Sequence, residues 1–245
     1  YVVPTEIVDL PSKGKFYPQS HPLYDKECVE IKHMTAKEED ILTSASLIEK
    51  GVALDHLIQS LLLDKSINAK TLLAGDRNAI LLNARINGYG ADYKINSFCS
   101  KCTTTDEIEI DLAKIKNKEL NFENENVAFE LPKAKYPVTI RFLNAHEEEL
   151  LQKEVVKKTN LGLAENYTLT FLKFIITSIN GIKANDGVTS QFIDNMPAAD
   201  AKYIKSFYAD SKPDVEFFLE LECSSCSHTE RREVPITAQF FWPEF

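Results

Sequence analysis

The chain has 245 residues, of which 44% are hydrophobic, 27% charged and 10% aromatic, a composition that supports a sizeable buried core and excludes wholesale disorder, collagen and coiled coils. Lys and Arg number 28 against 37 Asp and Glu, so the net charge of −9 disfavours binding to nucleic acid. No run approaches the about 18 apolar residues of a membrane-spanning helix, and the first residues lack a signal-peptide pattern, so we expect a soluble, intracellular globular protein.

An extended N-terminal arm is predicted for residues 1–26. Its segment Asp9-Leu-Pro-Ser-Lys-Gly-Lys-Phe-Tyr-Pro18 mixes Pro and Gly with aromatic residues, which favours ordered, extended chain over helix. The sequence leaves open whether this arm covers its own core or docks on a neighbouring subunit. For docking on a partner, the candidate side chains are Leu10, Pro11, Phe16 and Tyr17.

Residues 27–112 form the first of two predicted repeats. A short strand begins at Val29, and a helix follows, because Thr35 and Glu38 have the spacing of a helix capping box. Further helical patterns occupy 52–63 and 76–86. Two alternating segments, 93–98 and 105–112, then predict a β-hairpin.

A connector, residues 113–136, separates the repeats and holds a predicted strand at 127–131. Residues 137–237 form the second repeat, because Val138 to Leu151 align without gaps on Val29 to Leu42. Asn144 and Glu147 take the capping positions. Helices are predicted at 165–179, near 190–195 and at 197–208, before a second hairpin. The predicted fold class is therefore α+β, with two pseudo-symmetric repeats of strand, helices and hairpin.

Residues 238–245 form an aromatic C-terminal tail. Ends as apolar as this one are normally tied down. Whether the tail binds its own chain or a partner stays open, and its candidate partner-binding side chains are Phe240, Phe241 and Trp242.

Four of the five cysteines form two CxxC pairs, and each pair lies between two predicted strands, at a hairpin tip. Two such turns complete a tetrahedron of thiolates, so we predict one structural Zn²⁺ that joins the repeats. Redox chemistry, disulfides and separate weak sites remain alternatives. The fifth, Cys28, is predicted to be a small buried hydrophobic residue. The predicted zinc ligands are Cys99, Cys102, Cys223 and Cys226.

No enzyme motif is found. The sequence contains no Gly-rich phosphate loop, no HExxH and no GxSxG, and none of its five histidines has a companion at metal-ligand spacing. Glu38 and Glu147 are explained as helix caps. We therefore expect a non-enzymatic protein without catalytic residues.

Five motifs follow one another along the chain: Asp9–Pro18, Val29–Asp40, Leu73–Arg77, Gly88–Gly90 and Cys99–Cys102. This ordered set resembles the baseplate hub and hub-assembly proteins of T4-like contractile-tailed bacteriophages. The resemblance implies a structural or assembly component of the hub, made in the host cytoplasm and acting there or in the virion tail baseplate. Its implied partners are other baseplate, hub or tail proteins, or its own copies, with no small-molecule substrate. A zinc-containing, nucleic-acid-associated regulator is the second hypothesis, and a metalloenzyme the third.

Overall fold

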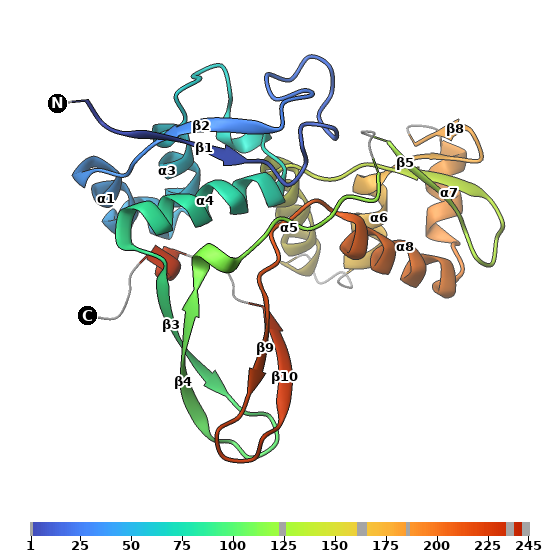
Figure 1. Ribbon diagram of the computed structural model, residues 1–245. Helices are drawn as coiled ribbons and strands as arrows, with labels where there is room; N and C mark the ends of the chain where they lie inside the picture. The colour runs from blue at the N-terminus through green and yellow to red at the C-terminus, as the bar shows by residue number, and fades with distance from the viewer. Residues whose placement is uncertain (1, 123–125, 161–165, 185–186, 234–237, 242–245) are drawn as a thin grey trace.

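The computed structural model describes residues 2–122, 126–160, 166–184, 187–233 and 238–241. A helical body carries small sheets, and two hairpins project from it (Figure 1). The described helices are α1 (Ala36–Thr43), α2 (Ala45–Glu49), α3 (Ala53–Leu61), α4 (Ala74–Tyr89), α5 (Ala145–Asn160), α6 (Tyr167–Ile175), α7 (Gly187–Asp194) and α8 (Ala198–Ser211). The described strands are β1 (Thr5–Asp9), β2 (Cys28–Lys32), β3 (Asp92–Phe98), β4 (Thr105–Asp111), β5 (Val127–Glu130), β6 (Pro137–Ile140), β7 (Ile176–Ile179), β8 (Ile182–Lys183), β9 (Phe218–Glu222) and β10 (Thr229–Glu233).

The N-terminal segment packs on its own chain. Strand β1 pairs with β2 in antiparallel register, and the turns that follow are fixed by the fully buried carboxylate of Asp76 in α4. This carboxylate accepts hydrogen bonds from the Ser12 backbone N–H at 2.9 Å, the Ser12 hydroxyl at 2.6 Å and the Tyr17 hydroxyl at 2.7 Å. Of the two placements that the sequence leaves open, the structure shows the one over the chain's own core.

The two predicted capping boxes are confirmed, and they share a third contact. At the start of α1, the Thr35 backbone N–H donates to Glu38 at 3.0 Å, and at the start of α5 the Asn144 backbone N–H donates to Glu147 at 3.1 Å. Each glutamate also accepts from a basic residue six positions earlier, at 2.6 Å in both cases. Both strand-to-helix junctions, β2–α1 and β6–α5, are thus held by the same side-chain pattern.

The second half contains a four-stranded antiparallel sheet with strand order β5-β6-β7-β8. Here the predicted helix over 165–179 is wrong in its last turn, because α6 ends at Ile175 and residues 176–179 form β7. This Ile-Thr-Ser-Ile segment is rich in β-branched residues, and its pairing with β6 outweighs the helical periodicity. Asn180 and Gly181 both have positive φ, 50° and 78°, which builds the tight hairpin turn to β8.

The two halves share one hydrophobic core. Buried side chains of the first half, such as Leu57 and Leu82, belong to the same cluster as Val138 and Leu172 of the second half. The Leu72 carbonyl also accepts a backbone hydrogen bond from Ala145 at the start of α5. Within the described residues, no helix is both long enough and apolar enough to cross a lipid bilayer.

Two aromatic residues of the C-terminal tail are buried in the same core. Phe240 and Phe241 are 1% and 0% exposed. The buried guanidinium of Arg85 donates to the Phe240 carbonyl at 3.1 Å and to the Gly90 carbonyl at 2.6 Å. Hydrogen bonds to a charged donor are the stronger kind, so Arg85 fastens this segment to the end of α4.

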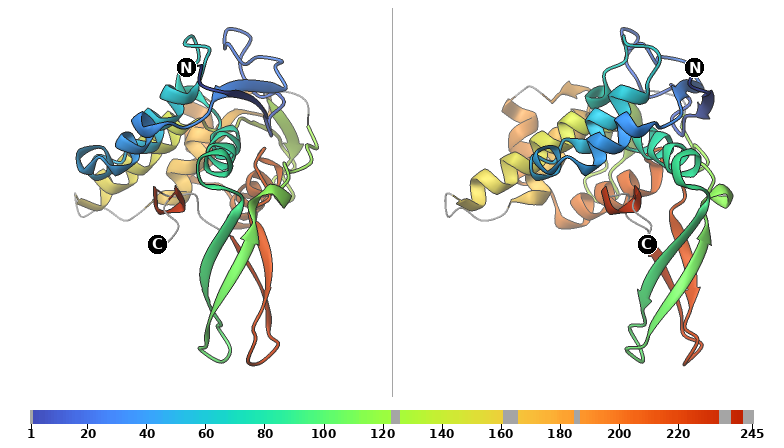
Figure 2. Two further views of the ribbon diagram at one scale, coloured as in Figure 1. Left: turned by 60° about the vertical axis from the view of Figure 1, so that its left-hand side comes forward. Right: turned by 90° about the vertical axis from the view of Figure 1, so that its left-hand side faces the viewer.

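The hairpins β3–β4 and β9–β10 are separate two-stranded sheets that lie side by side and project from the body (Figure 2). We call residues 92–111 and 216–233 the stalk. Both predicted hairpins are confirmed. The fold is a mixed helix-and-sheet structure in which the stalk is the feature that stands furthest from the core (Figure 1).

Candidate metal centre

Strand alternation directs the two hairpins toward each other. Along β3 and β4, Ile95 and Ile108 are half-buried, whereas the residues directly before and after each of them are exposed. Ile108 lines a small pocket together with Leu221 of β9, and the same pocket is bordered by Cys99 and Cys223. Apolar contact between the hairpins therefore brings their tips together.

Both CxxC pairs have the same backbone turn. Cys99 N–H donates to the Thr104 carbonyl at 2.9 Å, and Cys223 N–H donates to the His228 carbonyl at 3.0 Å. The residue after each pair, Thr103 or Ser227, has positive φ, 62° or 51°. The left-handed residue closes each turn and leaves both sulfurs on its inner side.

The structure brings the four predicted cysteine ligands together. The Sγ atoms of Cys99 and Cys226 are 3.7 Å apart, those of Cys102 and Cys223 are 3.4 Å apart, and all four lie within 4.8 Å of one another. In a tetrahedral site with Zn–S bonds of about 2.3 Å, neighbouring sulfurs are separated by about 3.8 Å. All four are free thiols. The group has the number, spacing and chemistry of ligands that a metal ion requires.

The surroundings favour the thiolate form at one corner of the group. Hydrogen bonds from the Thr104 hydroxyl and backbone lower the pKa of the Cys102 thiol to about 6. Backbone hydrogen bonds lower the pKa of the Cys223 and Cys226 thiols, but burial and contacts with neighbouring sulfurs outweigh them and raise it. Because metal ions bind the thiolate, a bound ion would have to displace protons from these two sulfurs. The His228 backbone carbonyl accepts the hydrogen bond that closes the Cys223–Cys226 turn, and His228 is not a member of the four-residue group.

A pair of matching contacts joins the tips beside the sulfurs. The Asp106 carboxylate of β4 accepts from the Ser224 hydroxyl at 2.6 Å and from its backbone N–H at 3.0 Å. Glu230 of β10 accepts a hydrogen bond from the Arg232 guanidinium at 3.0 Å and also interacts with the hydroxyl and backbone N–H of Ser100 in the other hairpin. The Ser224 contacts lower the pKa of the Asp106 carboxyl group, and Arg232, with a smaller effect of Ser100, lowers the pKa of the Glu230 carboxyl group. The sequence showed the turns but not these contacts, because a carboxylate that lies 118 residues from its serine partner has no local signal.

The other candidate residues lie apart from the stalk tip. The structure buries those of the N-terminal segment and two of the tail in the chain's own core, so in this conformation they offer no open surface. Trp242 lies outside the described residues. The burial predicted for Cys28 is wrong, because it alternates with Val29 along β2 and takes the exposed side of the strand. The buried candidates are Leu10, Pro11, Phe16, Tyr17, Phe240 and Phe241.

Comparison with known proteins shows one relationship. The profile of a family described as "T4 bacteriophage base plate protein" matches residues 3–242. No curated protein and no solved structure matches the chain. The match covers both hairpins of the stalk and nearly all of the body.

Proposed function

Because the chain belongs to the T4 bacteriophage base plate protein family, we propose that it is a non-enzymatic structural or assembly component of the baseplate hub. It is made in the host cytoplasm and acts through protein–protein contacts during tail morphogenesis. The observation that carries this proposal is the family match over residues 3–242. Membership supports tail proteins as its partners and the virion tail as its destination.

The proposal includes one structural Zn²⁺, held by Cys99, Cys102, Cys223 and Cys226. Four thiolates form a closed shell without an open coordination position, which suits a structural ion rather than a catalytic one. The ion would link residues 124 positions apart in the sequence. Because the assembled site does not exist in the unfolded chain, binding of the metal contributes directly to the free energy of folding.

We also propose that the chain arose by duplication. The CxxC pairs are offset by 124 residues, and so are Asp76 and Asp200, the third residues of α4 and α8. Asp200 accepts from the backbone N–H groups of Lys133 and Ala134, at 2.8 and 3.0 Å. Asp200 thereby holds the turn that follows Leu131-Pro132, just as Asp76 holds the turn that follows Leu10-Pro11.

These buried carboxylates support a non-enzymatic role. Asp76 and Asp200 are both fully buried, and their carboxylate oxygens accept hydrogen bonds from backbone N–H groups in turns. Glu38 and Glu147 cap helices. A carboxylate engaged in this way holds structure together and has no oxygen to spare for general acid or base work.

Complementation tests the proposed function. Cells infected with a phage that lacks this gene would be supplied with the wild-type chain, with Cys223→Ser, or with Cys28→Ser as the control that also removes one thiol. We expect complete baseplates, seen by electron microscopy, with the wild type and the control, and few with Cys223→Ser. Complete baseplates in the absence of the protein would contradict the proposal. A salt-dependent shift of labelled DNA or RNA by the pure protein would favour the nucleic-acid hypothesis instead.

A further inference from the structure

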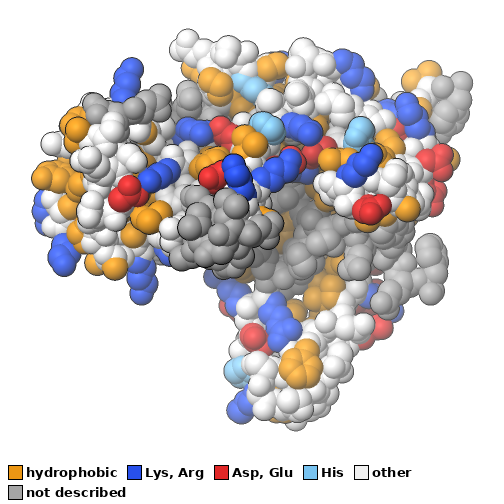
Figure 3. Space-filling view, turned by 180° about the vertical axis from the view of Figure 1, so that it is seen from behind, with side chains coloured by type: hydrophobic (Ala, Val, Ile, Leu, Met, Phe, Trp, Pro, Cys, Tyr) orange, Lys and Arg blue, Asp and Glu red, His pale blue; other side chains and the backbone are white. Residues whose placement is uncertain are grey.

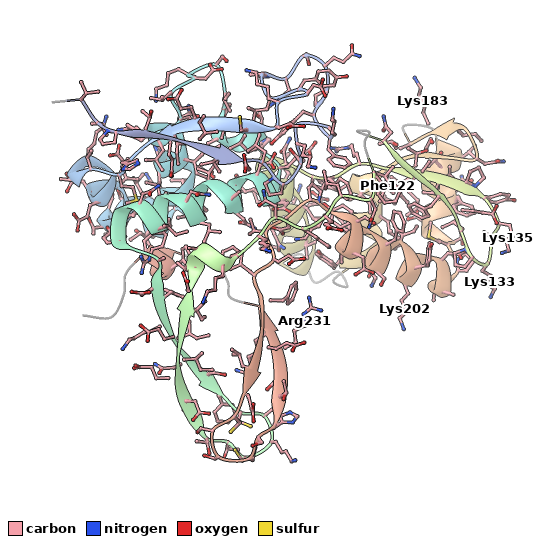
Figure 4. The ribbon with its side chains drawn as sticks, viewed as in Figure 1. Phe122, Lys133, Lys135, Lys183, Lys202 and Arg231 are labelled. Carbon is pink, nitrogen blue, oxygen red and sulfur yellow. The ribbon has the colours of Figure 1, made fainter. Side chains whose placement is uncertain are left out.

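One end of the body carries exposed lysines in an otherwise acidic protein. Lys133 and Lys135 lie on the β5–β6 turn, Lys183 on β8 and Lys202 on α8 (Figure 4). Within the described residues, three of them have no ion-pair partner, and Lys135 has one weak contact, at 3.9 Å from Glu130. We call this surface the cationic end.

The lysines are held in place by buried contacts beneath them. Asp200 binds the backbone N–H of Lys133, which fixes the turn against the start of α8, two residues before Lys202. The Thr189 hydroxyl of α7 donates to the Lys183 carbonyl at 3.1 Å, and the rings of Tyr136 and Phe192 are 5.6 Å apart. The spacing of the charges is therefore set by the fold before any partner arrives.

Apolar side chains are exposed among these lysines. Tyr136 is 42% exposed and Ile182 is 41% exposed. From behind, this end of the body shows hydrophobic side chains gathered on its surface with basic side chains around them (Figure 3). Such a surface suits a partner that presents both carboxylates and apolar groups.

The stalk has the complementary chemistry. Each of its hairpins, 92–111 and 216–233, contains five acidic and two basic residues. Along β9, Phe218, Glu220 and Glu222 are exposed, and Leu221 between the two glutamates is buried. The Phe218 ring, 50% exposed, carries the Arg231 guanidinium over one face. A Zn²⁺ held by four thiolates would add two further negative charges at the tip.

We propose that the stalk of one copy docks on the cationic end of a second copy of this chain. Within one chain the stalk projects from the middle of the body, away from the cationic end (Figures 1 and 2), so the contact joins two molecules. Because two different surfaces meet, a pair of copies keeps one free stalk and one free cationic end, and further copies extend the pair into a ring or an open chain. The inference goes beyond the hub role and needs an intact stalk, whatever metal it holds.

Analytical ultracentrifugation of the metal-loaded full-length protein tests the inference. We expect the mass to rise with protein concentration beyond that of a dimer and to fall with added salt. Lys133→Glu with Lys202→Glu, or Glu220→Lys with Glu222→Lys, should each weaken association by at least about tenfold. The matched controls, Lys37→Glu with Lys50→Glu and Glu27→Lys with Glu49→Lys, change the same charges elsewhere on the exposed surface and should leave it unchanged.

Charge exchange makes the test specific. An equimolar mixture of the two reversed variants, or all four reversals in one chain, should restore association because opposite charges face each other again. A wild type that stays monomeric at every concentration overturns the inference, as does association that the reversals leave unchanged. Binding of a DNA oligonucleotide through these lysines by a monomeric wild type also overturns it. Metal content and complementation are read separately, so a monomer that binds metal and restores baseplates leaves the proposed function standing.

Discussion

The Asp106 carboxylate and the Ser224 hydroxyl, from different hairpins, are 2.6 Å apart at the tip of the stalk. Adding 124 to Ser100 and Asp106 gives Ser224 and Glu230, and Ser100 and Glu230 also interact across the tip. The sulfur contacts Cys99–Cys226 and Cys102–Cys223 are exchanged by the same offset of 124. Two surfaces that swap roles in this way are related as the subunits of a twofold dimer are, so the proposed duplication predicts that the stalk tip is a symmetric joint within one chain.

Removal of one thiol should release the metal and loosen the stalk. For Cys223→Ser we expect bound zinc to fall from one ion per chain to nearly none, and the melting temperature to fall by about 10 °C or more, because loss of a structural zinc costs several kcal/mol. Elemental analysis and thermal unfolding monitor both effects. Cys28→Ser, an exposed thiol outside the site, should change neither, and a Cys223→Ser protein that retains zinc would refute the assigned ligands.

The matching contacts at the tip should contribute equally. In Asp106→Ala and Glu230→Ala, the serine N–H and hydroxyl that orient each CxxC turn lose their acceptor, so a chelator should remove zinc faster, by up to about tenfold, in both variants. A colorimetric zinc indicator follows the release. Glu109→Ala, which removes an exposed carboxylate from the same strand as Asp106, is the control. A large effect in one variant and none in the other would contradict the symmetric joint.

The buried carboxylate of Asp76 should be the main anchor of the N-terminal segment. Asp76→Ala leaves two donors of Ser12 and the Tyr17 hydroxyl without their acceptor, which should cost about 3 kcal/mol in the free energy of unfolding. Tyr17→Phe removes only one donor to this carboxylate, together with the acceptor of the Leu73 N–H, and should cost about 1–2 kcal/mol. Urea denaturation gives both values. If Tyr17→Phe proves as costly as Asp76→Ala, the carboxylate is not the anchor.

The Glu38 carboxylate should make stability depend on pH. Burial raises its pKa, but hydrogen bonds from Lys32, Ser60 and Thr35 outweigh burial and lower the pKa from 4.5 to about 2. A carboxyl group with a lowered folded-state pKa stabilises the fold above its unfolded-state pKa. This stabilisation should therefore be complete above about pH 5 and be lost as the pH falls toward 2.

A comparison of the Glu38 protein with its Glu38→Gln variant isolates the contribution of the Glu38 charge to stability. Thiolates release a bound metal in acid, so both proteins also carry Cys223→Ser, and the free energy of unfolding is measured at several pH values. The difference between the two proteins should shrink as the pH falls from 5 toward 2. A difference independent of pH would show that the glutamate charge does not stabilise the β2–α1 junction.

Local signals in the sequence predicted the parts of the structure that local chemistry decides. Thr35 and Glu38 form their cap because the partners are three residues apart, and the CxxC pairs form tight turns for the same reason. Residues 176–179 were mispredicted because pairing with β6, far away in the sequence, decides their conformation. The contact of Asp106 with Ser224 and the cationic end likewise depend on segments that only the fold brings together.

X-ray absorption spectroscopy at the zinc edge of the purified full-length protein shows whether the stalk tip holds zinc. We expect one zinc per chain with four sulfur neighbours at about 2.3 Å and no nitrogen or oxygen neighbour. A protein without zinc, or a zinc ion that shares its shell with histidine, carboxylate or water, would contradict a metal-closed joint between the two hairpins.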